Sequence, residues 1–235
     1  MKKKWKYSGI AIGITLLFLL ITFKIIDHDS WKPWSLPLSG KIVIIDPGHG
    51  GPDAGATNGS ALEKEIALSV SKKIRDYLQE QGALVMLTRE EDKDLADQET
   101  KGLRNRKRED LRRRVEFINK SEADLYITLH LNSFPSSHWS GAQTFYSTRY
   151  EENQRAAKLI QHEIRRSMEN TSREAKALNT IYLMKRATKP GALVEIGFLS
   201  NPREKVQLQS DIYQEKIASA IYKGISRYFT EEDIK

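Results

Sequence analysis

The sequence of 235 residues contains no cysteine. This absence excludes disulfides, thiolate metal sites, a cysteine nucleophile and a lipid anchor attached to cysteine. Any bound metal ion must therefore be held by histidine and carboxylate side chains. Histidine is also scarce, with five residues at positions 28, 49, 130, 138 and 162. The search for a metal site is correspondingly short.

The segment Gly9–Phe23 near the N-terminus contains no charged residue. Four lysines at positions 2, 3, 4 and 6 precede the uncharged, largely apolar run Gly9–Phe23. A basic start followed by a short apolar run is typical of a secretory signal or signal anchor, which we assign to residues 1–26. No A-x-A arrangement of small residues follows, so we favour an uncleaved membrane anchor over a cleaved peptide. We expect the remainder of the chain to be exported, and either anchored on the outer face of the cytoplasmic membrane or secreted.

The chain is basic, with 38 Lys and Arg against 31 Asp and Glu and a formal net charge of +7. This balance favours an anionic partner such as nucleic acid, a membrane surface or a cell-wall polymer. Export argues against nucleic acid. The densest basic run, Lys101–Arg114, is equally consistent with contact to an anionic polymer or to substrate carboxylates, and with a solvated helix face.

No internal repeat or low-complexity segment is present. Residues 27–40 contain Trp31, Pro33, Trp34 and Pro37 without helical or strand periodicity, which indicates a linker. Residues 41–230 form the predicted catalytic domain. Within it, apolar patterning predicts strands at 42–45, 84–88, 125–129, 142–146, 181–184 and 192–196, and helices at 63–81, 110–120, 151–170 and 211–229. Alternating strands and helices predict a single α/β domain with a mostly parallel, twisted sheet covered by helices on both faces.

Two histidines follow predicted strands and one glutamate begins a predicted helix. His49 lies in the glycine-rich loop after the first strand, His130 follows another strand, and Glu63 opens the first helix. The carboxyl ends of neighbouring parallel strands open into one crevice. Two histidines and one carboxylate leave an open position on zinc, the arrangement of a catalytic site. The alternative is that each residue satisfies its own local hydrogen bonds.

Glu195 interrupts an otherwise apolar predicted strand, Ala192–Leu199. An ionised carboxylate in such a place is costly unless it is paired or used. It is a candidate for the base that a metal hydrolase needs. Burial raises the pKa of such a group and a nearby metal lowers it, so the sequence leaves the direction open. An ion pair with one of the arginines is the alternative interpretation.

These segments together resemble the zinc-dependent N-acetylmuramoyl-L-alanine amidases of bacterial cell walls. The resemblance covers Lys41 to Phe229 and is carried, in order, by the segments 45–51, 62–64, 87–89, 129–132 and 194–201. It implies Zn²⁺ bound by His49, Glu63 and His130, with Glu195 as the catalytic residue. Glu65 is a weaker rival to Glu63, because the family motif places the ligand immediately before a lysine. Arg89 is expected in a supporting role.

The resemblance implies hydrolysis of the amide between the lactyl group of muramic acid and the L-alanine of the peptidoglycan stem peptide. The linker and the single N-terminal apolar segment are most similar to germination-specific, spore-cortex members of the family in endospore-forming bacteria. The implied partners are peptidoglycan, a membrane if the N-terminal segment is uncleaved, and a regulatory protein. Two alternatives stay open: another zinc-dependent peptidoglycan hydrolase, cutting as an endopeptidase or carboxypeptidase, and a wall-binding module without catalysis.

Overall fold

The computed structural model describes residues 13–22 and 36–230. Residues 13–22 form a helix with mostly exposed side chains. Leu36–Lys235 is a separate compact unit. Much of the predicted signal or anchor segment 1–26 and of the predicted linker 27–40, including both of the linker's tryptophans, lies outside the described residues. In the two described ranges, no helix has the length and apolar character needed to cross a membrane.

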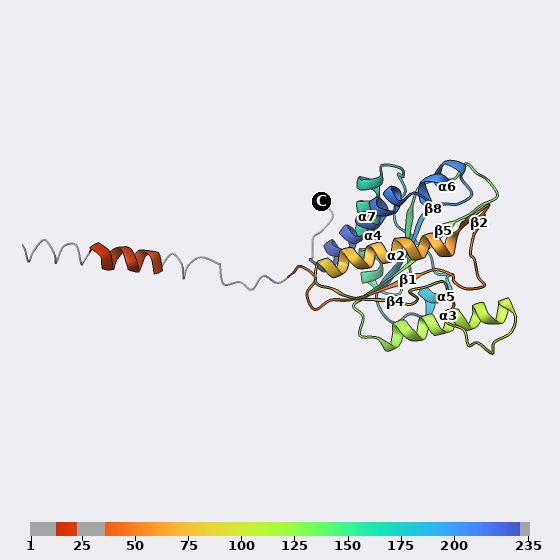
Figure 1. Cartoon of the computed structure of the whole chain (residues 1–235), viewed down its shortest axis with the longest axis horizontal. Helices are drawn as coiled ribbons and strands as arrows, with labels where there is room; N and C mark the ends of the chain where they lie inside the picture. The colour runs from red at the N-terminus through yellow and green to blue at the C-terminus, as the bar shows by residue number, and fades with distance from the viewer. Residues whose placement is uncertain (1–12, 23–35, 231–235) are drawn as a thin grey trace, which may run out of the picture. The chain divides into compact units, whose positions relative to one another are not determined.

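A six-stranded sheet forms the centre of the larger unit, in the order β4-β1-β5-β8-β6-β7 (Figure 1). The first four strands in this order are parallel, whereas β6 pairs antiparallel with β8 and parallel with β7. A separate short hairpin joins β2 and β3. The mostly parallel α/β fold predicted from the sequence is confirmed. The strands are β1 (Ile42–Pro47), β2 (Thr57–Asn58), β3 (Ala61–Leu62), β4 (Leu84–Leu87), β5 (Leu125–Asn132), β6 (Gln143–Tyr146), β7 (Lys176–Ala177) and β8 (Gly191–Phe198).

Helices cover both faces of this sheet. Because side chains alternate along a strand, Val43 and Ile45 of β1 point to one face and Ile44 to the other. The first face packs into the larger core cluster with α2, α4 and α7, and the second into a smaller cluster with α3 and α5. Figure 1 shows α2, α4 and α7 on one side of the strands and α3 with α5 on the other. The helices are α2 (Glu63–Glu80), α3 (Leu103–Lys120), α4 (Glu151–Met168), α5 (Tyr182–Arg186), α6 (Pro202–Leu208) and α7 (Asp211–Phe229).

Several elements differ from the sequence prediction. The predicted strand at 181–184 is wrong, since Tyr182–Arg186 forms the short helix α5 with Leu183 and Met184 buried against the sheet. A short apolar run carries no period that separates a strand from a buried helical turn. Helix α3 begins at Leu103 rather than at the predicted residue 110. The prediction missed its first two turns because they are charged and mostly exposed, and so lack an apolar stripe. The edge strand β7 and helix α6 were not predicted.

The pairing register brings three strand ends to one edge of the sheet. Asp46 of β1 is level with Thr128 of β5, and His130 of β5 is level with Glu195 of β8. The carboxyl ends of the parallel strands therefore meet where the sequence places its candidate site residues. This is the edge at which open α/β sheets bind their ligands.

Candidate active site

His49 stands on a strained loop immediately after β1. Its φ of 60° is in the left-handed region, which costs a residue with a Cβ about 1–3 kcal/mol. Such a conformation persists only where its surroundings hold it. Here two buried arginines bind the loop's carbonyl oxygens. Arg89 donates to Pro47 O and Gly48 O, and Arg114 donates to Pro47 O and His49 O.

Asp46 anchors this loop from below. Its carboxylate is buried and accepts hydrogen bonds from Thr88, Thr128 and Arg114 at 2.6–2.7 Å. Burial alone would raise the pKa of Asp46, but the charge of Arg114 and the two hydroxyls outweigh burial and lower that pKa. Arg114 is in turn held by Asp110 at 2.8 Å. The site loop is therefore joined to the residue after β4, to β5 and to α3 through buried charge-assisted hydrogen bonds.

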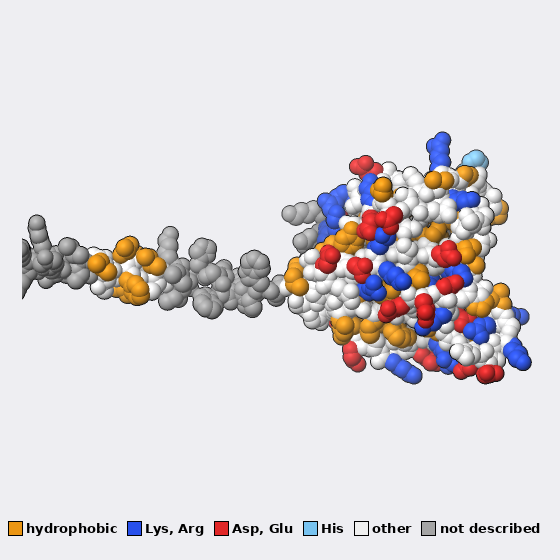
Figure 2. Space-filling view, in the orientation of Figure 1, with side chains coloured by type: hydrophobic (Ala, Val, Ile, Leu, Met, Phe, Trp, Pro, Cys, Tyr) orange, Lys and Arg blue, Asp and Glu red, His pale blue; other side chains and the backbone are white. Residues whose placement is uncertain are grey.

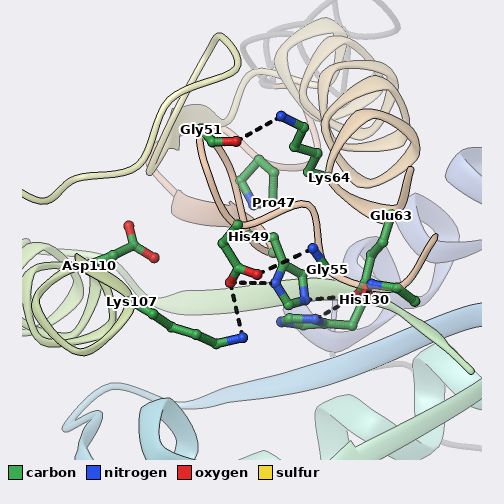
Figure 3. A network of polar contacts seen from close by, with 12 residues as sticks. Pro47, His49, Gly51, Gly55, Glu63, Lys64, Lys107, Asp110 and His130 are labelled. Carbon is green, nitrogen blue, oxygen red and sulfur yellow. Dashed lines mark hydrogen bonds and ion pairs between the residues drawn. The ribbon is translucent and has the colours of Figure 1, made fainter. Parts of the chain in front are cut away.

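His49, Glu63 and His130 converge on one point (Figure 3). Glu63 Oε1 lies 3.2 Å from His49 Nε2 and 2.9 Å from His130 Nδ1. The candidate ligand atoms of all three residues lie within 4.8 Å of one another, and no other such group of three occurs in residues 13–22 and 36–230. The three residues come from the loop after β1, the start of α2 and the end of β5. The rival Glu65 is exposed.

Glu63 is fixed in place by backbone donors as well. Ala56 N–H donates to its Oε2 at 2.7 Å, and Leu131 N–H donates to its Oε1 at 2.9 Å. Burial would raise the pKa of Glu63, but hydrogen bonds to the two histidines hold that pKa well below its usual range. Glu63 is thus an ionised carboxylate whose orientation is set before any ligand binds.

Asp53 is a site residue that the sequence analysis missed. Its Oδ2 accepts a hydrogen bond from His49 Nδ1 at 2.8 Å and pairs with Lys107 Nζ at 3.0 Å. A carboxylate on one ring nitrogen fixes the tautomer and leaves the other nitrogen free to bind a metal. The available signal was its place four residues after His49 in the same glycine-rich loop. Arg114 was missed too, because it ends a basic run whose role the sequence left open.

The arrangement fits a bound cation. Burial lowers the pKa of His49, but hydrogen bonds to Asp53 and Glu63 reverse this effect and raise it to about 9. The carboxylates therefore stabilise positive charge at the point where the two imidazoles meet. Two histidines and one carboxylate form a donor set that zinc accepts at catalytic sites.

Glu195 lies in the same pocket, next to His130 across the β5–β8 pair. Its Oε2 is inaccessible to solvent and has no hydrogen-bond partner among the described residues. Burial, partly offset by His130, raises the pKa of Glu195 to about 7. The arginine ion pair considered above is not formed. A partly buried carboxyl group with an uncommitted oxygen and a pKa near neutrality is suited to proton transfer.

Two glycines leave room for the converging side chains. A Cβ at Gly48 would stand 2.5 Å from the His130 ring, and one at Gly55 would stand 2.6 Å from Glu63 Oε2. The glycines of the loop therefore serve close packing of the three site residues. Part of the pocket lining is apolar and includes Leu111, Leu183 and Leu193.

The two other histidines that the structure describes do not belong to this cluster. His162 lies in α4, where its Nδ1 is 2.9 Å from Arg227 Nη1. His138 belongs to the loop between β5 and β6, with its backbone N–H bonded to Ser136. His28 lies outside the described residues. Arg89 supports the site as expected, since it also donates to Lys64 O at 2.7 Å beside Glu63.

Comparisons with known proteins agree with this geometry. A family described as N-acetylmuramoyl-L-alanine amidase matches residues 43–227. The germination-specific N-acetylmuramoyl-L-alanine amidase of Bacillus subtilis is 59% identical over 232 residues, covering 99% of this chain and 98% of that protein. The amidase LytC of the same species is 32% identical over 195 residues, covering 82% of this chain and 36% of LytC.

Solved structures give the same result. The CwlD amidase of Clostridioides difficile, determined in complex with the GerS lipoprotein, superposes with a TM-score of 0.79 at 42% identity, covering 82% of this chain and all of that chain. The match favours an amidase over the two alternatives, a peptidase and a wall-binding module. The chain belongs to the N-acetylmuramoyl-L-alanine amidase family and is an enzyme of that activity.

Proposed function

We propose that this amidase uses a zinc ion bound by His49, Glu63 and His130, with Glu195 as the residue that transfers protons. The observation that carries the proposal is the convergence of these three candidate ligand residues, of which His49 and His130 line one pocket with Glu195, whose Oε2 has no hydrogen-bond partner among the described residues. Zinc at this position would supply Lewis-acid activation of water and of the amide carbonyl. The protein's own residues would perform the remaining steps.

Glu195 would accept a proton from the attacking water and return it to the departing amine of L-alanine. Burial raises the pKa of Glu195 to about 7 in the absence of a metal ion, and a nearby cation would lower it, which favours the ionised form that accepts the proton. Asp53 would hold the imidazole of His49 with Nε2 facing Glu63 and His130. The apolar wall formed by Leu111, Leu183 and Leu193 would limit competing water around the reacting amide.

The physiological substrate we propose is the peptidoglycan of the spore cortex. The support is the similarity over 99% of the chain to a protein named as germination-specific. We further propose that the chain is exported and that a regulatory protein binds it. The solved relative in complex with the GerS lipoprotein supports this last point.

The metal and the catalytic residue are tested together on the purified full-length chain. Wild-type protein and the Glu195→Gln variant are dialysed, assayed for zinc by mass spectrometry and incubated with peptidoglycan. We expect about one zinc per chain in both, and stem peptides with a free L-alanine amine from the wild type alone. Removing a base of this kind should lower turnover at least ~10²-fold.

A matched variant separates the two roles. His130→Ala should lose zinc as well as activity, whereas Glu195→Gln should lose activity only. Near-normal turnover by Glu195→Gln would remove it from the reaction, and full zinc retention by His130→Ala would remove that ligand. Products cut within the peptide would contradict the assigned bond.

A further inference from the structure

Helix α3 presents two different sides at the edge of the active site. Lys107, Asp110 and Arg114 recur at helical spacing and line the active-site pocket. Lys101, Arg108 and Arg112 line a second groove, together with Asn105, Glu109 and Thr100. Tyr182 of α5 lines both. The second groove, called the basic groove below, therefore adjoins the active-site pocket at Tyr182.

The cations of the basic groove differ from most others on α3. Arg106, Arg113 and Arg114 are paired with Asp94, Glu109 and Asp46, and Lys107 is paired with Asp53. Lys101 and Arg108 have no ion-pair partner among the residues that the structure describes. Arg112 is bonded to Glu116 at 2.5 Å and also pairs with Glu109, which lines the groove, at 4.0 Å.

The only carboxylate lining the groove is already occupied. Glu109 accepts hydrogen bonds from Thr100 Oγ1 and from Arg113 Nε. The charges of Lys101 and Arg108 in the groove are therefore not paired with any carboxylate of the residues that the structure describes. Figure 2 shows Lys and Arg side chains standing out beside Asp and Glu on the lower right of the molecule, where Figure 1 places α3. Two of the unpaired cations, Lys101 and Arg108, therefore line one hollow that shares Tyr182 with the active-site pocket.

We propose that the basic groove binds a free carboxylate of the stem peptide, beyond the bond that is cut. This rests on the proposed function. In intact peptidoglycan the lactyl carboxyl of muramic acid is consumed in the scissile amide, so the remaining carboxylates belong to the peptide. Charge complementarity therefore assigns the peptide, rather than the glycan, to the side of the pocket that Tyr182 shares with the groove. Lys101 and Arg108 determine specificity and do not touch the reacting atoms.

The test uses soluble N-acetylmuramoyl-tetrapeptide in two forms, with free carboxylates and with every carboxylate converted to amide. The proteins are the full-length wild type, Lys101→Gln/Arg108→Gln, and the matched control Arg104→Gln. Arg104 is also an exposed α3 cation without an ion-pair partner among the described residues, but it does not line the groove. With the free form, the double variant should raise KM about 3- to 10-fold at unchanged kcat, as expected for two exposed charge contacts.

With the fully amidated form, the wild type should already have the raised KM. The double variant should then have the same KM as the wild type, because the carboxylate that the two cations bind is absent. Equal behaviour of the double variant and Arg104→Gln would overturn the proposal. So would a KM increase of the same size on both forms. A defect seen only on whole walls, and not on the soluble peptide, would assign the groove to an anionic wall polymer and overturn it too.

Binding is measured separately by calorimetric titration of the free form into Glu195→Gln protein with and without the two groove substitutions. A Kd that rises about 3- to 10-fold supports the groove, and an unchanged Kd overturns it, whichever bond the wild type cuts. Failure of the proposed function appears instead as a missing zinc ion or a wrong product in the wild type. The two failures are therefore distinguishable.

Discussion

Gly55 illustrates how closely single residues control the site. Its φ is +69°, and a Cβ built on it would meet Glu63 Oε2 at 2.6 Å and His49 Cδ2 at 2.7 Å. Glu63 cannot retreat without breaking its bonds to Ala56 and Leu131. The positions of Glu63 and His49 therefore depend on the absence of a Cβ atom at Gly55.

We expect Gly55→Ala to weaken zinc binding about 10- to 100-fold, as disturbed support of metal ligands commonly does. The measurement is competition against a chromophoric chelator. Gly59→Ala is the matched control, because its φ of +64° imposes the same backbone strain, yet its Cβ meets only the flexible end of Lys205 at 3.3 Å. Both variants should lose roughly 1–2 kcal/mol of stability. Equal zinc affinity in the two would contradict the steric argument.

The three residues that converge in the site could be named from the sequence as candidate ligands, whereas some residues that hold them in place could not. His49 and His130 follow apolar strands, and Glu63 opens an amphipathic helix, so each has a positional signal of its own. Asp53 and Arg114 act through contacts to His49 that arise only when the loop folds back against α3. The position of Asp53 four residues after His49 was a weak signal, and Arg114 was one of many cations in a basic run. The unpartnered oxygen of Glu195 is likewise a property of packing.

Among the elements, β1, β5 and α3 depend on one buried ion pair. Asp46 of β1 and Arg114 of α3 are both about 1% exposed and lie 2.7 Å apart. Removing one partner of such a pair leaves the other charge buried without compensation, which costs about 3–5 kcal/mol. Loss of the carboxylate should therefore loosen α3 and the loop that carries His49 together.

Lowering the pH should gradually remove the same stabilisation, because Asp46 becomes protonated. The pKa of Asp46 is lowered below its ordinary value of 3.8 in the folded protein, so its stabilisation is complete above that value and declines as the pH falls below it. We expect Asp46→Asn to be less stable than the wild type at pH 7, with a gap that holds down to about pH 5 and narrows below about pH 4. Urea unfolding at each pH measures the gap. If the difference in unfolding free energy between the wild type and Asp46→Asn increased at low pH, the assigned direction of the Asp46 pKa shift would be contradicted.

Elements with strong periodicity were predicted well, and short ones were not. Helices α2 and α7 follow their predicted spans within one residue, because a continuous apolar stripe faces the sheet. Helix α5 was predicted as a strand, since five residues are too few to display a helical period. Strand β7 was missed because its two residues are exposed and show no apolar pattern. It is a strand only through its backbone pairing with β6 at the edge of the sheet.

At the scale of the whole molecule, the core face opposite α3 depends on two long helices in close contact. Gly224 of α7 is buried, and a Cβ at this position would stand 2.4 Å from Ile160 Cα and 2.8 Å from Ile160 N, both backbone atoms of α4. Backbone cannot move aside as a side-chain end can. Any residue larger than glycine must separate the helices and disturb their packing on the sheet.

Gly224→Ala should therefore lower the free energy of unfolding by about 1–3 kcal/mol, although alanine is the better helix former. The melting temperature should fall by about 2–4 °C per kcal/mol for a domain of this size. Lys223→Ala, an exposed neighbour on the same turn, should change it little. The site is built from β1, β5, β8 and the start of α2, so zinc content and turnover at low temperature should survive in both variants. Loss of zinc from folded Gly224→Ala protein would instead mean that α4 and α7 position the metal ligands directly.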